Sequence, residues 1–286
     1  MDNDEQIILK ELDKARNAYL EKDYSKALKS YKWIEQQILD DSFNLSVIQI
    51  EIGWTYYNLQ NYKNCIHYLK KIEDNKSITV AQRFDCKRLI GFSYEYLGNN
   101  EKAIIYINKA IKEDTNVVNK KYALFELGKI HFIQGAMAKA KPYLLKAKDL
   151  FKKNELKYKE AVDYYLGFIT FYEKDFQKAH DYFLDIIKNA TNAGSEASGY
   201  FGLAHLHYEK KQYPVLIDVS KKILRLSPNF YDMETLGFFL CKSYLEMKML
   251  NDLRIFYSEL LKNYPEGRYK NYYPTFEKSL KKVIQK

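Results

Sequence analysis

The stretch Ile52-Gly53-Trp54-Thr55-Tyr56-Tyr57, followed by Asn61-Tyr62 and then Cys65, decides the fold of this chain. Its small residue, Gly53, stands three positions before an aromatic residue, Tyr56, so both lie on one face if the segment is helical. After a short polar turn, Tyr62 and Cys65 repeat the same three-residue step. The stretch therefore predicts two consecutive amphipathic helices joined by a turn.

The same register recurs along the whole chain at a nearly fixed period. The small residue reappears at intervals of 38, 38, 37, 39, 37 and 37 positions, as Ala15, Gly53, Gly91, Gly128, Gly167, Ala204 and Cys241. A sustained period of this length indicates a repeat architecture, in which each unit buries its apolar face against the next unit. Polar residues fall between the two helices of their units, where each can cap the following helix; they are Asp23, Asn61, Asn99 and Asp175.

This pattern resembles the tetratricopeptide repeat (TPR) family. The clearest copies are the stretch beginning at Ile52 and the stretch Ile90-Gly91-Phe92-Ser93-Tyr94, which is followed by Gly98-Asn99-Asn100-Glu101-Lys102-Ala103. The resemblance implies an all-α fold, an α-solenoid that forms a right-handed superhelix of antiparallel helix pairs with a C-terminal capping helix. The family repeats every 34 residues, whereas the period here is about 38 residues.

The resemblance also predicts how the chain is divided. We expect residues 1–7 to form an N-terminal tail and residues 271–286 to form the capping helix. Seven repeats are expected across residues 8–270, with approximate bounds of 8–45, 46–83, 84–120, 121–159, 160–196, 197–233 and 234–270.

Composition narrows the classes of function. Charged residues make up 29% of the chain and hydrophobic residues 47%, which is typical of a folded, water-exposed protein. No secretory signal, membrane-length apolar run or lipidation motif is present in the sequence, and the three cysteines (Cys65, Cys86 and Cys241) are widely spaced. We therefore predict a cytoplasmic protein without a disulfide framework or a membrane span. The net charge of +9 comes mainly from lysine, and scattered lysines indicate solvated helix faces rather than base readout.

Aromatic residues reach 16% of the chain, more than repeat packing alone requires. In TPR proteins a second stripe on the first helix of each repeat lines a concave groove, at fixed offsets from the small residue. Carried onto this chain, together with two neighbouring tyrosines, those offsets predict a partner-binding groove formed by Trp54, Tyr57, Phe92, Tyr96, Phe125, Phe132, Tyr164, Phe168, Phe171, Tyr172, Phe201, His205, Tyr208 and Phe238.

This stripe favours a scaffold or adaptor that binds a peptide or an amphipathic helix of a partner protein, because exposed aromatic patches commonly mark interaction sites. Two alternatives remain open for the stripe: the chain fills its own groove, or copies of the chain associate through it. A different class, the binding of single-stranded nucleic acid or another polyanion, is compatible with basic charge and aromatic residues. A further alternative is a peptide-sensing TPR regulator that works with a separate effector.

Motifs for catalysis are missing from the sequence. No glycine-rich phosphate loop is present, and His205 and His207 would point about 200° apart on a helix, which disfavours a metal pair. We therefore predict that the protein is not an enzyme and has no catalytic, cofactor-binding or metal-binding residues.

Overall fold

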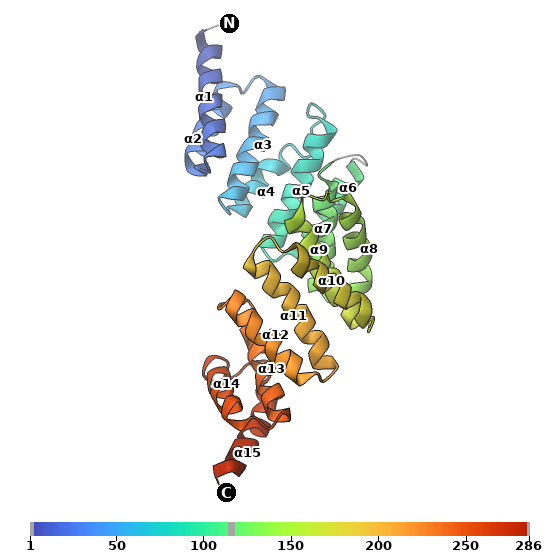
Figure 1. Ribbon diagram of the computed structural model, residues 1–286. Helices are drawn as coiled ribbons and strands as arrows, with labels where there is room; N and C mark the ends of the chain where they lie inside the picture. The colour runs from blue at the N-terminus through green and yellow to red at the C-terminus, as the bar shows by residue number, and fades with distance from the viewer. Residues whose placement is uncertain (1–2, 114–117, 285–286) are drawn as a thin grey trace. The chain divides into compact units, whose positions relative to one another are not determined.

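The computed structural model describes residues 3–113 and 118–284, which form helices and no strands. Within that part of the chain no helix is long and apolar enough to cross a lipid bilayer. Figure 1 shows the helices, which are α1 (Asn3–Leu20), α2 (Tyr24–Gln37), α3 (Ser42–Asn58), α4 (Tyr62–Lys70), α5 (Val80–Tyr96), α6 (Asn100–Glu113), α7 (Lys120–Ile133), α8 (Met137–Leu150), α9 (Leu156–Tyr172), α10 (Phe176–Asn189), α11 (Ala193–Glu209), α12 (Tyr213–Leu226), α13 (Met233–Glu246), α14 (Leu250–Asn263), the 3-10 helix η1 (Lys270–Tyr272) and α15 (Tyr273–Ile284).

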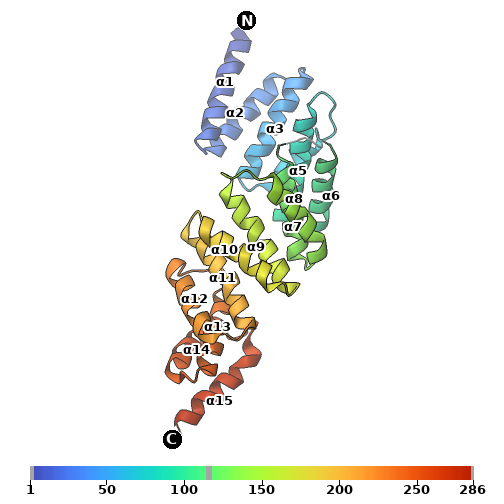
Figure 2. The ribbon, with the colours of Figure 1, turned by 45° about the vertical axis from the view of Figure 1, so that its right-hand side comes forward.

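The chain folds into two compact units, residues 1–147 and residues 148–286. In the first unit each helix from α1 to α7 contacts the next, and α5 also contacts α3 and α7. In the second unit each helix from α9 to α15 contacts the next, and α10 lies against both α9 and α11 (Figure 2). The predicted fold class, an all-α solenoid of helix pairs, is confirmed. The predicted bounds of the seven repeats stay a prediction.

The recurring glycines allow close approach between the two helices of a pair. A methyl group added at Gly91 would come within 2.5 Å of the Ile107 side chain, and one at Gly167 within 2.5 Å of the Phe183 ring. Gly53 and Gly128 stand against Leu69 and Leu144 in the same way. Each glycine thus leaves room for a large, fully buried side chain from the second helix of its own pair, which gives dense packing without a void.

The turns within the pairs follow the sequence period closely. Asp23, Asn61, Asn99 and Asp175 each accept a hydrogen bond from a backbone N–H three residues later, so the predicted capping is confirmed. One residue before each of these caps the backbone is left-handed, a conformation that favours glycine. Glycine occupies only some of the equivalent positions, which are Lys22, Gln60, Gly98, Gly135, Lys174, Lys211 and Lys248.

The structure corrects the predicted N-terminal tail. Residues 3–7 form the first turns of α1, where Asp4 and Glu5 lie at the helix N-terminus and interact favourably with its dipole. Residues 1–2 lie outside the described residues. At the other end, α15 follows the short helix η1, and Phe276 on α15 is fully buried against Tyr257 and Phe238.

Candidate functional site

The predicted stripe begins in the first unit with Trp54 and Phe92, which flank an arginine that the predicted site omits. The Arg88 guanidinium lies 5.3 Å from the ring centroids of both aromatic residues, and it donates a 2.8 Å hydrogen bond to Asp85. Phe92 is only 8% exposed, and Trp54 is partly buried. This part of the stripe is therefore a stacked cation–π arrangement whose charge is already paired.

The remaining stripe residues of the first unit differ in exposure. Tyr57 contacts Tyr96 edge to face at 5.9 Å, and Tyr96 stacks on Tyr62 at 4.7 Å while staying exposed. Phe125 is buried and Phe132 is partly buried. Tyr96 is therefore the residue of this group that offers the most ring surface to solvent.

In the second unit the stripe forms one continuous aromatic cluster. Phe168 lies 5.2 Å from His205 and 6.3 Å from Phe201, and Phe171 lies 5.8 Å from His205. All three phenylalanines are buried, whereas Tyr172, next to them on α9, is exposed. These side chains pack mainly on one another, so much less of the surface of the three phenylalanines faces outward than a partner-binding groove would need.

Residues outside the stripe cover its C-terminal part. Phe238 is buried beneath Tyr269, whose ring stacks on it at 4.0 Å, and beneath Tyr272 at 4.8 Å. Tyr208 stacks on Phe239 at 4.7 Å and is partly buried. Tyr269 and Tyr272 thus cover Phe238, a contact of the kind that the self-filling alternative predicts, while the groove itself stays a prediction.

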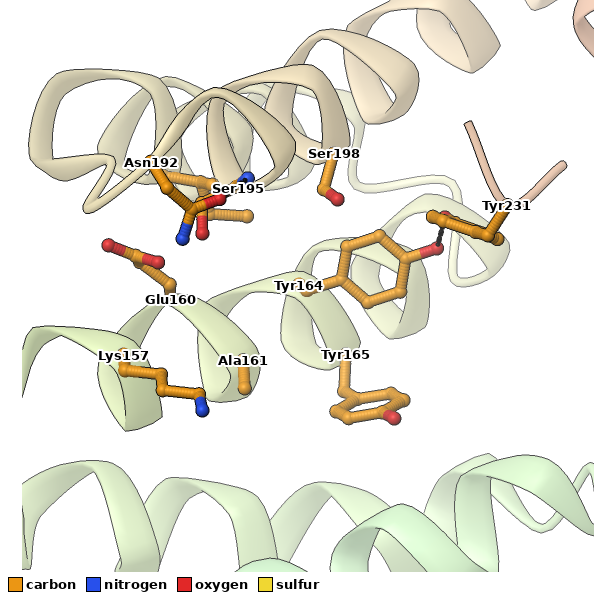
Figure 3. A pocket seen from close by; sticks show the side chains of 10 residues that line it. Lys157, Glu160, Ala161, Tyr164, Tyr165, Asn192, Ser195, Ser198 and Tyr231 are labelled. Carbon is orange, nitrogen blue, oxygen red and sulfur yellow. Dashed lines mark hydrogen bonds between the residues drawn. The ribbon is translucent and has the colours of Figure 1, made fainter. Parts of the chain in front are cut away.

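A cavity of about 430 Å³ remains open in the second unit. Figure 3 shows Glu160 and Tyr164 of α9 directed toward α11. Tyr231, from the loop before α13, meets Tyr164 in a short contact between the two hydroxyl groups. The full lining is Lys157, Glu160, Ala161, Tyr164, Tyr165, Ile186, Asn192, Ser195, Ser198 and Tyr231.

The polar groups of this cavity differ in how far they are satisfied. The buried Glu160 carboxylate accepts hydrogen bonds from the Thr191 N–H at 2.8 Å and from the Thr191 hydroxyl at 3.1 Å. Ser198 donates to the Gly194 carbonyl of its own helix at 3.0 Å. Burial raises the pKa of Tyr164, so its hydroxyl stays protonated at neutral pH and can donate a hydrogen bond. The site thus combines aromatic walls with a few fixed polar groups, which is typical of a binding pocket.

The sequence predicts only Tyr164 among the residues that line this cavity. Tyr231 is 67 positions away and lies in a loop, so no helical period places it opposite Tyr164. Its ring also contacts Phe201 at 5.7 Å. The only signal in the sequence was the aromatic pair Phe230-Tyr231 directly after Ser227-Pro228-Asn229, a cluster that marks a loop between units.

His205 is expected to make the second unit sensitive to acid. Burial among aromatic rings lowers the pKa of His205 from 6.5 to about 4, so the unfolded chain takes up this proton before the native chain does. The second unit should lose up to about 3 kcal/mol of unfolding free energy as the pH falls from 6.5 to 4. Urea unfolding across this pH range, followed by circular dichroism, measures the loss.

The substitution His205→Phe should flatten that pH dependence, because the ring contacts are kept and the titrating group is removed. His180 of α10 lies outside the aromatic cluster, and His180→Phe serves as the control that should keep the wild-type slope. An equal slope in wild-type and His205→Phe protein between pH 6.5 and pH 4 would show that His205 takes up its proton at the same pH in the native and the unfolded chain.

Reactive side chains in the described residues lie in surroundings that suppress their reactivity. The thiols of Cys65, Cys86 and Cys241 are buried, and burial raises the pKa of each to about 12. They are therefore protonated and poor nucleophiles at neutral pH. No group of three or more histidine, cysteine, aspartate or glutamate residues placed to hold a metal ion occurs in residues 3–113 and 118–284.

Comparisons with known proteins match this architecture. A family model described as Tetratricopeptide repeat matches residues 48–75, 89–116 and 122–154. Response regulator aspartate phosphatase E of Bacillus subtilis (strain 168) is 23% identical over 184 residues, which cover 61% of this chain and 49% of that protein. The chain thus spans about half the length of that relative.

Two solved structures show the same fold over most of the chain. The apo form of the quorum sensor NprR from B. thuringiensis superposes with a TM-score of 0.65 at 17% identity, covering 91% of this chain and 77% of that one. The Rap conjugation gene regulator of the plasmid pLS20, in complex with the Phr peptide, superposes with a TM-score of 0.50 at 17% identity, covering 86% and 74%. The matched segments therefore carry tetratricopeptide repeats, and the helix pairs and the structural likeness show the same all-α fold over most of the chain.

Proposed function

We propose that this protein binds a peptide or an amphipathic helix of a partner protein in the tyrosine-lined cavity of its second unit. The observation that carries the proposal is the cavity of about 430 Å³ that Tyr164, Tyr165 and Tyr231 line. Its residues come largely from α9 and α11, the first helices of consecutive pairs. In TPR proteins these helices line the surface that receives partners.

The cavity suits an apolar side chain flanked by backbone. The rings, together with Ala161 and Ile186, provide apolar walls, and burying one large apolar side chain there contributes about 1.5–3 kcal/mol. The hydroxyl groups of Tyr164 and Ser195 lie at the same cavity and can bond to the amide groups of a bound segment. Lys157 also lines the cavity and adds a positive charge.

The substitution Ser198→Trp is expected to abolish peptide binding, because the indole would occupy the cavity. Ser198 gives up only a 3.0 Å bond to the backbone carbonyl of Gly194, so its replacement leaves the packing of α11 largely intact. Peptides selected on the wild-type protein from a displayed random library are labelled, and their affinity is measured by fluorescence anisotropy.

A matched control is available in the same unit. Ser258 on α14 makes the same kind of bond, at 2.8 Å to the Arg254 carbonyl, and is exposed. Ser258→Trp should bind the selected peptides like the wild type. Equal affinity of the Ser198→Trp protein would place the peptide site elsewhere.

A second candidate function, a peptide-responsive regulator, is favoured by the names of the structural relatives. One relative is named as a quorum sensor and another as a gene regulator in complex with a peptide. In this candidate the bound peptide alters the affinity of the chain for a separate effector protein. This candidate is supported if the amount of effector protein bound by the chain changes in proportion to the fraction of chain occupied by a selected peptide. If the bound amount is unchanged when the peptide site is full, the chain acts as a simple scaffold.

The proposal also holds that the chain works in the cytoplasm and is not itself an enzyme. The three free cysteines support a reducing compartment, and because they are buried and protonated they offer no thiolate nucleophile at neutral pH. The phosphatase activity in the name of the B. subtilis relative is that protein's own. A peptide or helix of a partner protein is favoured over single-stranded nucleic acid as the bound molecule. Oligonucleotide binding that weakens steeply with salt would favour nucleic acid instead.

A further inference from the structure

The first unit carries a repeated contact between a lysine and a pair of neighbouring tyrosine rings that are tilted against each other. Lys32 of α2 lies 5.5 Å from the ring centroid of Tyr56 and 5.6 Å from that of Tyr68. Three positions after this lysine, Glu35 accepts a long hydrogen bond of 3.4 Å from the Tyr68 hydroxyl. One helix thus supplies both a cation and a carboxylate to the ring pair of the next two helices.

The next repeat reproduces the arrangement residue by residue. Lys70 lies 5.5 Å from the Tyr94 ring centroid and 5.3 Å from that of Tyr106, and the Tyr106 hydroxyl donates to Glu73 at 3.4 Å. Lys109 lies 4.6 Å from the Tyr106 ring centroid. The second set consists of Lys70, Glu73, Tyr94 and Tyr106. Each of these residues stands 38 positions after its counterpart in the first set, so the contact belongs to the repeat.

The third ring pair lacks these partners. His131 and Tyr143 stack with their centroids 5.7 Å apart, at the positions that correspond to Tyr94 and Tyr106. The positions that correspond to Lys70 and Glu73 hold Asn108 and Ile111, so neither the cation nor the carboxylate is supplied from the preceding repeat. The third ring pair therefore lacks both the cation and the carboxylate that accompany the first two pairs.

A cavity of about 410 Å³ lies at this third ring pair. His131, Lys139, Tyr143 and Lys146 line it together with Ala138 and Pro142, so its charged lining consists of two lysines and no acid. Neither lysine forms an ion pair within the described residues. His131 is nine-tenths buried, and its Nδ1 has no hydrogen-bond partner in that part of the chain.

We propose that this cavity binds a carboxylate, carried by an acidic side chain of a partner, in the place that Glu73 takes at the preceding ring pair. The carboxylate accepts a hydrogen bond from the Tyr143 hydroxyl, as Glu73 does from Tyr106. Lys139 and Lys146 supply the compensating positive charge. This site is in the first unit and is separate from the cavity of the proposed function in the second unit.

The test is a titration of the full-length protein with blocked glutamate (N-acetyl-glutamate N-methylamide), followed by the ring signals of His131 in an NMR spectrum. Blocked glutamine, which has the same shape and no charge, is the matched ligand control. Glutamate should shift the His131 signals and glutamine should not. An equal response to acetate would assign the site to free carboxylates, whereas a stronger response to blocked glutamate would assign it to an acidic side chain.

Two kinds of variant sharpen the test. Tyr143→Phe removes the hydroxyl donor and should weaken binding about tenfold. Ile111→Glu restores the residue that the preceding repeats carry and should block the site from within. Because Ile111 packs against the core, Lys139→Ala/Lys146→Ala serves as a second loss variant at exposed positions. Equal shifts from glutamate and glutamine, or unchanged binding in both Tyr143→Phe and the double-alanine variant, would overturn the proposal.

Discussion

Replacing Gly202 with alanine is expected to destabilise the second unit by about 2–3 kcal/mol, although alanine normally stabilises a helix interior. Gly202 lies within α11, and a Cβ there would overlap three atoms of the Phe183 ring. That ring is fully buried and also stands against Gly167 of α9, so it has no free side to move toward. Urea unfolding monitored by circular dichroism at 222 nm would measure the loss as a lower midpoint.

The same exchange at Gly237 provides the control. Gly237 lies within α13, where a Cβ would approach only the end of the flexible Leu260 side chain, at 3.1 Å. Gly237→Ala should therefore be neutral or stabilising by up to about 1 kcal/mol. Phe183→Leu, which shortens the opposing side chain, should recover part of the stability lost in Gly202→Ala. Equal effects of alanine at 202 and 237 would show that the Phe183 ring does not fill the space beside Gly202.

The helix pairs can be predicted from the sequence because the residues that pack against each other recur at the same positions of successive repeats. A glycine on the first helix is matched by a large side chain on the second, such as Ile107 or Phe183. Both the period and the contacting residues can therefore be recognised in the sequence. The capping residues follow the same logic, because a cap acts on a backbone N–H three positions away. Local chemistry repeated at a fixed interval is what a single sequence reveals best.

The exposure of the aromatic stripe could not be predicted in the same way. Phe201 and Phe238 occupy predicted groove positions on the first helices of their repeats, yet each is covered by a residue that lies outside the helix pair. Tyr231 covers Phe201 from a loop, and Tyr269 covers Phe238 from the segment before η1. Loop residues carry no helical period, so their long-range contacts become visible only in the folded chain.

The second large effect is expected from Glu113→Gln, which should cost the first unit about 2 kcal/mol of unfolding free energy at neutral pH. Glu113 ends α6, and its carboxylate lies 2.5 Å from Arg83 Nε and 2.6 Å from Lys87 Nζ. Glutamine keeps the shape but removes the charge that balances both cations of α5. Lys87 is 7% exposed and would retain only its 3.0 Å contact with the exposed Asp74.

The effect of this substitution should vanish in acid, which distinguishes an electrostatic cause from a packing defect. Burial by itself raises the pKa of Glu113, but hydrogen bonds from Lys87 and Arg83 outweigh it and hold the pKa below the ordinary value of 4.5. The unfolded chain therefore takes up the proton at a higher pH than the native chain. The stabilisation is complete above pH 4.5 and is lost as the pH falls through the lower pKa of the folded state.

Denaturant unfolding of the wild type and Glu113→Gln over this range should therefore give two curves that converge toward low pH. Glu246, which pairs with Lys242 at 2.6 Å on an exposed helix face, is the control site. Glu246→Gln should cost at most about 0.5 kcal/mol at neutral pH, because exposed pairs one turn apart on a helix contribute little. If the difference in unfolding free energy between wild type and Glu113→Gln stayed constant through the acid range, the loss would come from altered packing of the side chain. It would then not come from the charge that Glu113 shares with Arg83 and Lys87.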